Sequence, residues 1–280
     1  MKRILDYSLI ITSVGILGTA CDNKPATSTN GGKNTTTENP VISSLKEQIL
    51  QHPDSTRLYD KLIDQYTTNR NYTAAVTWCD SLLKRNEDIN FSYWFVKGDL
   101  QRQALQFEEA IFSYKTYLNR FPDDEQILLN LANTNAEAGN IESLAQSDAF
   151  IKRAATRDIK ADGYFIKGVY YSRVREFDKA IENFDQTIIN RYSFLEAYLE
   201  KAIAQYDKEQ YYDALKTLDQ LLTVSQSYPD AYYWKGKSYE ALRKNDDALK
   251  NYETAYSLDK TFTEAKQKTE SLKALRKSKL

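Results

Sequence analysis

The strongest constraint on the fold of this chain is a small residue that returns about every 34 residues. The series comprises Ala75, Ala110, Ala180, Ala214 and Ala248, with Leu144 in the double-length interval between Ala110 and Ala180. A period of this length is typical of arrays of helix–turn–helix units, in which each unit buries its apolar face only by stacking on its neighbours. The period therefore predicts an all-α chain, and it indicates binding rather than catalysis.

Other positions recur in phase with these alanines. If each alanine is position 20, the units span residues 56–90, 91–124, 125–160, 161–194, 195–228 and 229–262. Position 8 is Gly or Ala in every unit after the first, whereas positions 4, 17 and 24 are mostly large. Small residues let two helices approach closely, and large ones fill the space around the contact. Within unit 161–194 the apolar spacing predicts helices over about 162–174 and 178–190.

This pattern resembles the tetratricopeptide repeat over residues 56–262. The resemblance implies a right-handed α-solenoid of about six units. Position 27 often carries a larger residue than the family's alanine, so the pitch of the superhelix stays open. Unit 125–160 departs most, because Asn135 and Asp148 replace expected aromatic residues, Leu144 replaces alanine, and two residues are inserted. We expect a flexure or a local irregularity there.

Both ends of the array, which we expect over residues 41–278, carry a helix that can cap it. A leading helix is predicted over 41–51 and a final helix over 263–278, with Leu272 and Leu275 turned inward. The other face of the final helix carries Lys266, Lys268, Lys273, Arg276, Lys277 and Lys279. This basic face is either a solvated cap or a docking patch for anionic lipid or an acidic partner.

Residues 1–20 have the pattern of a secretory signal, with a basic start, a short apolar stretch and small residues before a cleavage point. The stretch is shorter than the roughly 20 apolar residues that span a bilayer. The segment from Gly18 to Cys21 resembles the lipobox of bacterial lipoproteins. That resemblance implies a lipid, typically including palmitate, on Cys21, followed by a flexible linker to residue 40. The alternative is an ordinary secretory signal with an incidental cysteine.

Composition limits the possible partners. The chain has 38 basic and 39 acidic residues, which gives no basic footprint for nucleic acid. If Cys21 carries lipid, Cys79 has no partner for a disulfide. Cys79 falls at position 24, and we expect a buried, inert thiol there. Most tyrosines fall at packing positions of the repeats.

The sequence offers no catalytic, metal or cofactor site. The single histidine, His52, stands in a turn beside Pro53, and no nucleophile motif accompanies it. The glycines stand at position 8 or in the linker rather than in a phosphate-binding loop. Clusters of His and Cys that could hold a metal are absent from the sequence. We therefore expect no enzyme, no cofactor and no small-molecule substrate.

The resemblance to the tetratricopeptide repeat implies a partner-binding groove on the first helix of each unit. Its residues at positions 5 and 9 are Asp60, Asp64, Phe95, Asp99, Leu129, Asn133, Phe165, Val169, Leu199, Ile203, Tyr233 and Lys237. We expect a groove that is acidic toward the N-terminus and apolar beyond it, with the apolar residues as anchors for a partner segment. The alternative is that some of these apolar residues only complete the packing between units. The carboxylate clamp of chaperone-binding family members needs Lys, Asn and Arg at these positions, so it is not expected here.

These features predict a lipid-anchored, protein-binding scaffold of the bacterial cell envelope, with the outer membrane favoured over the inner. By architecture, such a scaffold resembles lipoproteins of the barrel-assembly machine and pilotins. Two alternatives stay open. One is a periplasmic adaptor of a cell-wall enzyme, and the other is an accessory lipoprotein of a surface uptake system, which would need an exposed aromatic platform.

Overall fold

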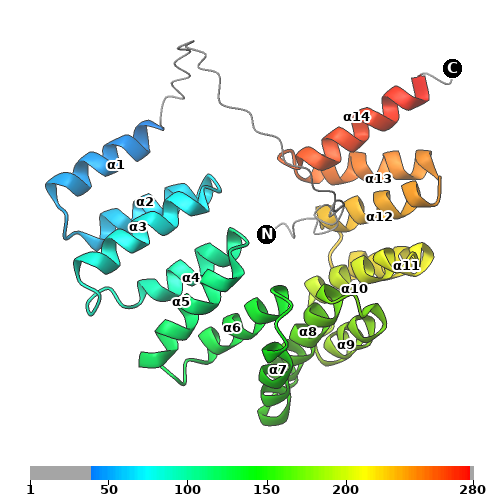
Figure 1. Ribbon diagram of the computed structural model, residues 1–280. Coiled ribbons are helices and arrows are strands. Elements are labelled where there is room, and N and C mark those ends of the chain that lie inside the picture. Colours follow the sequence, from blue (N-terminus) through cyan, green and yellow to red (C-terminus); the bar gives the residue numbers. More distant parts are fainter. Residues whose placement is uncertain (1–38, 278–280) are drawn as a thin grey trace, which may run out of the picture.

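The computed structural model describes residues 39–277, which form fourteen helices and no strand. The helices are α1 (Pro40–Gln51), α2 (Thr56–Thr68), α3 (Tyr72–Arg85), α4 (Tyr93–Gln103), α5 (Phe107–Arg120), α6 (Glu125–Glu137), α7 (Glu142–Arg153), α8 (Arg157–Arg173), α9 (Phe177–Asn190), α10 (Leu195–Asp207), α11 (Tyr211–Val224), α12 (Pro229–Ala241), α13 (Asn245–Leu258) and α14 (Thr263–Lys277). Successive helices pair as hairpins, and the hairpins stack into a curved array with α1 and α14 at its ends (Figure 1). Each of the six predicted units corresponds to one hairpin, as the repeat period predicts, although α8 begins at Arg157, before the predicted start of its unit at residue 161.

The predicted caps are present at both ends. Helix α1 buries Ile42, Leu45 and Ile49, and α14 buries Leu272, whereas Leu275 is 43 % exposed. None of the helices among residues 39–277 combines the length and the apolar character that crossing a bilayer requires. The predicted signal segment 1–20, the predicted lipidation site Cys21 and most of the predicted linker lie outside the described residues.

All six hairpins turn through the same backbone conformation. One residue of each turn has a positive φ, between 57° and 74°: Arg70, Leu105, Gly139, Arg175, Glu209 and Arg243. In the turn at Arg175, the N–H of Glu176 donates to the carbonyl of Tyr171, and the N–H of Arg175 donates to the carbonyl of Ser172. This pair of hydrogen bonds is the Schellman motif, which satisfies the last carbonyls of a helix and favours glycine at the left-handed position. Only Gly139 meets that preference within the described hairpins.

Arg175→Gly is therefore expected to raise the free energy of unfolding by about 0.5–1 kcal/mol, because glycine adopts a positive φ without the steric cost of a side chain. Urea unfolding followed by circular dichroism measures the change. The matched control is Glu182→Gly, at an exposed position inside α9, which is expected to cost about 1 kcal/mol. Destabilisation by both substitutions would show that the Arg175 side chain contributes more than its backbone strain costs.

The two helices of a unit approach closely where position 8 of the first helix meets position 24 of the second. A Cβ added to Gly168 would lie only 2.5 Å from the ring of Phe184, which is fully buried. Gly98 and Gly236 face Tyr114 and Tyr252 in the same way, at 2.6 Å. The expectation that small residues at position 8 admit large residues at position 24 is confirmed in these three units. The alanines at position 20 are completely buried as well.

Unit 125–160 is irregular, as expected, but its small buried residue is not the one that the repeat period assigned to position 20. The turn between α6 and α7 is one residue longer than the other hairpin turns. Counted from the residue with positive φ, however, the buried small residue comes early, because Ser143 follows Gly139 by four residues whereas Ala180 follows Arg175 by five. Helix α7 therefore buries Ser143, Ser147 and Phe150, whereas Leu144 is only partly buried. The assignment of Leu144 to the small buried position is therefore wrong, because Ser143 fills it. Helix α7 also packs closely on α8, where a Cβ on Gly163 would lie 2.6 Å from the Ile151 side chain.

Polar residues in this unit are paired rather than disruptive. Asn135 is completely buried, donates to Oε1 of Gln146 at 3.0 Å and accepts from Nδ2 of Asn140 at 3.1 Å. Asp148 accepts from Nζ of Lys167 at 2.9 Å. A buried amide with its partners in place costs little, whereas an unpaired one would cost about 1–3 kcal/mol.

The contact between Lys167 and Asp148 belongs to a series that links neighbouring units. A lysine of one unit's first helix pairs with an aspartate of the preceding unit's second helix: Lys97–Asp80 at 2.7 Å, Lys167–Asp148 at 2.9 Å, Lys201–Asp185 at 2.6 Å and Lys235–Asp219 at 2.6 Å. The lysine side chains are mostly buried along their stems, while the aspartates are more exposed. Partly exposed pairs of this kind stabilise by at most about 1 kcal/mol each, so their main effect is to set how one unit sits on the next.

Candidate functional site

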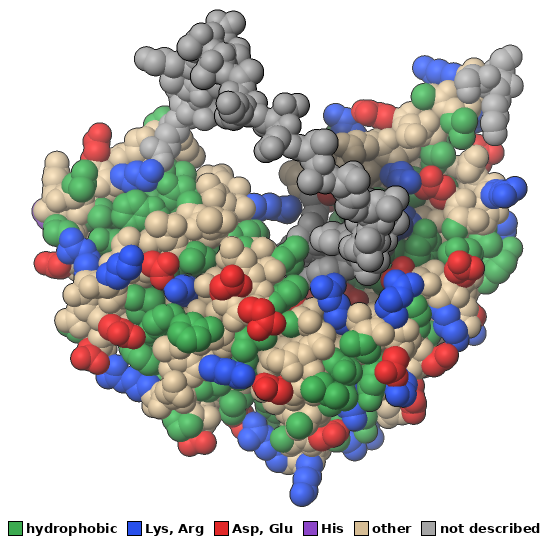
Figure 2. Space-filling view, in the orientation of Figure 1, with side chains coloured by type: hydrophobic (Ala, Val, Ile, Leu, Met, Phe, Trp, Pro, Cys, Tyr) green, Lys and Arg blue, Asp and Glu red, His purple; other side chains and the backbone are tan. Residues whose placement is uncertain are grey.

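The predicted groove residues all lie on the first helices of their units, α2, α4, α6, α8, α10 and α12, but they do not form one continuous binding surface. Their environments divide into an acidic N-terminal part and an apolar remainder that is largely packed. The space-filling view shows how the array bends around a central hollow (Figure 2).

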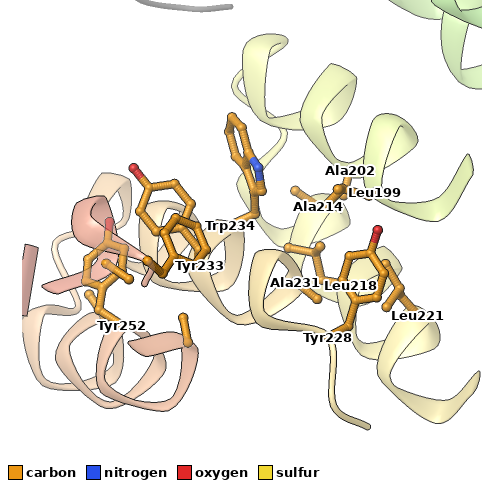
Figure 3. Close-up of a cluster of buried hydrophobic side chains, with 14 of the residues drawn as sticks. Leu199, Ala202, Ala214, Leu218, Leu221, Tyr228, Ala231, Tyr233, Trp234 and Tyr252 are labelled. Carbon is orange, nitrogen blue, oxygen red and sulfur yellow. The ribbon is translucent and has the colours of Figure 1, made fainter. Parts of the chain in front are cut away.

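Two of the predicted apolar anchors are core residues. Leu199 is 1 % exposed and Tyr233 is 8 % exposed, and both belong to one cluster with Leu218, Tyr228 and Tyr252 (Figure 3). Neither side chain is available to anchor a partner, so their assignment to the groove is wrong. Both side chains complete the packing of the core instead, and the ring partners Tyr252 and Phe262 of Tyr233 lie within its own unit.

The cause is an aromatic residue at position 34, which folds back over position 5 of the same unit. The ring of Phe194 stacks on Phe165 with centroids 4.7 Å apart, and the ring of Phe262 lies 5.0 Å from Tyr233. Tyr228 holds the same position beside Leu199 in the cluster. Phe194, Tyr228 and Phe262 recur at position 34 in the sequence. The groove prediction did not consider this recurrence, which indicates that position 5 is covered.

The other members of the apolar part are partly buried in the same packing. Leu129 and Val169 pack against the cluster that spans α6, α7 and α8, and Ile203 packs against the C-terminal cluster. Phe95 lies 6.3 Å from the ring of Tyr117. The remaining two predicted groove residues are polar: Asn133 is partly buried, and the ammonium of Lys237 lies 3.9 Å from the centroid of Trp234. The predicted apolar stripe thus supplies little free surface among the described residues.

The acidic part does line an open pocket of about 320 Å³ between α2 and α4. Its lining consists of Asp60, Ile63, Asp64, Thr67, Tyr93, Val96, Asp99, Leu100 and Gln103. Three predicted residues, Asp60, Asp64 and Asp99, therefore come together as expected. The sequence prediction missed Tyr93, because position 3 shows no recurring residue type.

Tyrosine hydroxyls hold two of these carboxylates. The hydroxyl of Tyr93 donates to Oδ1 of Asp60 at 2.5 Å, and the hydroxyl of Tyr114 donates to Oδ1 of Asp99 at 2.5 Å. Asn130 adds a bond from Nδ2 to the same oxygen of Asp99 at 3.2 Å. Burial and the Asp60 carboxylate raise the pKa of Tyr93 above its ordinary value, so this phenol remains a donor.

The other chemically capable residues have structural surroundings. Cys79 is completely buried, and burial raises the pKa of its thiol to about 12. His52 ends α1, where its N–H donates to the carbonyl of Gln48. Among residues 39–277, no group of three or more His, Cys, Asp or Glu side chains is arranged to hold a metal ion.

Residues 167–222 and 199–261 match the family described as tetratricopeptide repeat, and no curated protein matches the sequence. A tetratricopeptide repeat protein from Parabacteroides merdae ATCC 43184 has a similar structure, with a TM-score of 0.63 and 15 % identity over 82 % of this chain and 90 % of that one. PilW, a type IV pilus biogenesis factor, aligns with a TM-score of 0.55 and 18 % identity over 76 % of this chain and 97 % of that one. A thermophilic tetratricopeptide repeat protein of Thermus thermophilus gives a TM-score of 0.55 and 16 % identity over 64 % and 96 % of the two chains.

At these identities the likeness to the solved structures concerns the fold. The helical hairpins, the recurring small residues at positions 8 and 20, and the family match over residues 167–261 agree with one another. Together they show that this chain has the helical-repeat fold of tetratricopeptide repeat proteins.

Proposed function

We propose that this protein is a protein-binding scaffold of the bacterial cell envelope, which a lipid on Cys21 attaches to a membrane. The tetratricopeptide repeat fold supports the scaffold part, because proteins of this fold generally bind other polypeptides on their first helices. The signal-like segment 1–20 and the small residues before Cys21 support the anchor.

The observation that carries the binding part is the open pocket between α2 and α4. It presents the exposed carboxylates of Asp60 and Asp64 beside the partly buried Val96, while the C-terminal first helices are closed by their own aromatic residues. A partner therefore binds mainly at the N-terminal units. The corresponding surface consists of the inner faces of α2 and α4.

The partner belongs, in this proposal, to an envelope assembly or secretion machine. The similarity of fold to PilW, a pilus biogenesis factor, favours this over an adaptor of a cell-wall enzyme. An uptake accessory would display an aromatic platform for sugars, and within the described repeats most tyrosines and phenylalanines pack against other residues.

Affinity capture from solubilised membranes tests the proposal. A variant with Asp64→Trp and Gln103→Trp, which fills the pocket between α2 and α4, is expected to recover the partner at least about tenfold less than the unaltered chain, because bulky side chains exclude the bound segment. The matched control, Glu182→Trp with Lys216→Trp, places the same bulk on exposed positions of α9 and α11.

In the same experiment, mass spectrometry of the captured protein determines whether its N-terminus carries lipid. We expect a lipid-modified cysteine at residue 21. Equal recovery by both double variants would move the binding site away from the inner surface. A mature chain without lipid on Cys21 would remove the anchor from the proposal.

A further inference from the structure

We propose that the inner faces of α2 and α4 form a docking surface for a partner segment that inserts one lysine or arginine side chain into the pocket between them. This inference rests on the proposed function, and it names the chemistry that the partner must present. Charge, shape and hydrogen bonding at the pocket all support the same occupant.

The lining of the pocket is acidic, because it contains Asp60, Asp64 and Asp99. No lysine or arginine is among the residues that line it. Asp60 accepts from a phenol, and Asp64, one helical turn further along α2, is exposed to solvent. The lysine of this junction, Lys97, pairs with Asp80 of α3, which does not line the pocket. The lining of the pocket thus combines three aspartates with neutral side chains.

The shape of the pocket suits a long basic side chain. Ile63, Val96 and Leu100 provide apolar walls, and the carboxylates stand among them. Lysine and arginine bury their aliphatic stems along apolar surface while the charged end reaches a polar partner. A volume of about 320 Å³ is at the small end of ligand pockets, so it holds one side chain rather than a helix.

The spacing of the carboxylates argues for an extended organic cation instead of a metal ion. The acidic side chains here do not converge closely enough to hold a metal. A guanidinium can bond to separate carboxylates through its fork of N–H donors, and an ammonium can do so through three donors. Tyr93 also lines the pocket, and its hydroxyl holds the Asp60 carboxylate in place.

Fluorescence anisotropy of the full chain with two labelled peptides tests this inference. Both are short peptides with a central residue flanked by leucines; that residue is arginine in one peptide and citrulline, its uncharged analogue, in the other. The arginine peptide is expected to bind at least about tenfold more tightly, and added salt is expected to reduce the difference. The variant Asp60→Asn with Asp64→Asn keeps the shape and the acceptor for Tyr93 but removes two charges, so it should lose the preference.

The control variant, Glu47→Gln with Glu182→Gln, changes the net charge equally at exposed positions outside the pocket and should retain the preference. Equal binding of both peptides, no binding of either, or a preference that survives in the Asp60→Asn, Asp64→Asn variant would overturn the inference. A preference lost in the control variant would do the same, since it would reflect overall charge. If the asparagine variant still captures the membrane partner while the tryptophan variant does not, the scaffold function stands and only the basic side chain is rejected.

Discussion

Leu199→Glu is expected to unfold the C-terminal units rather than to weaken partner binding alone. The side chain is 1 % exposed in a cluster that joins α10 to α11 and α12. Loss of a buried leucine side chain costs about 2–5 kcal/mol, and an unpaired buried carboxylate adds several more. That total is comparable with the whole stability of a typical domain, about 5–15 kcal/mol. Thermal unfolding followed by circular dichroism measures the loss.

The exposed substitution Asp64→Lys is the control for this result. It reverses a charge on the inner surface and is expected to change stability by no more than about 0.5 kcal/mol. A Leu199→Glu protein with unchanged helicity and an unchanged melting temperature would contradict the placement of Leu199 in the core. The comparison matters for binding studies, because loss of capture by Leu199→Glu would report unfolding and not a lost anchor.

Phe184→Ala is expected to lower the free energy of unfolding by about 3–5 kcal/mol, since the ring is completely buried between α8 and α9. Gly168→Ala is expected to cost about 1–3 kcal/mol, because its new methyl group would meet that ring. In the Phe184→Ala background the ring is gone, and Gly168→Ala should become stabilising by up to about 1 kcal/mol through helix propensity.

This reversal of sign is the decisive observation, and urea unfolding of the four proteins measures it as a coupling energy. Glu182→Ala, on the exposed face of α9, is expected to be nearly neutral in both backgrounds. If Gly168→Ala costs the same with and without the ring, the close approach of Gly168 to Phe184 does not limit the crossing of α8 and α9.

The sequence predicted the units of the fold because their boundaries depend on local signals that recur. Five of the six hairpins fall within the expected spans, and α9 at Phe177–Asn190 nearly coincides with the helix expected over 178–190. Helix α8 begins five residues earlier than expected. Its start is set by Thr156, whose hydroxyl accepts from the N–H of Ile159, and a capping residue outside the periodic pattern does not alter the period.

The errors arose where a tertiary contact overrides position in the repeat. Helix α7 is rotated because its buried small residue, Ser143, follows the turn residue Gly139 one place earlier than in the other units. Counting along the sequence cannot show such a rotation. The burial of Leu199 and Tyr233 follows from aromatic residues at the end of the same unit, which a groove defined only on first helices ignores. The acidic part of the groove was predictable because Asp60 and Asp64 are too polar to be packed without partners.

The lysine–aspartate contacts between units make several junctions of this array chemically equivalent. The junctions between α9 and α10 and between α11 and α12 use the same pair, Lys201–Asp185 and Lys235–Asp219, and an aromatic residue closes the end of the unit before each of them. Duplication of a unit such as 195–228 would therefore create no new kind of interface. Between α5 and α6 the equivalent positions are Lys115 and Leu131, so a lengthening of the array by gene duplication is compatible with the C-terminal half and not with that junction.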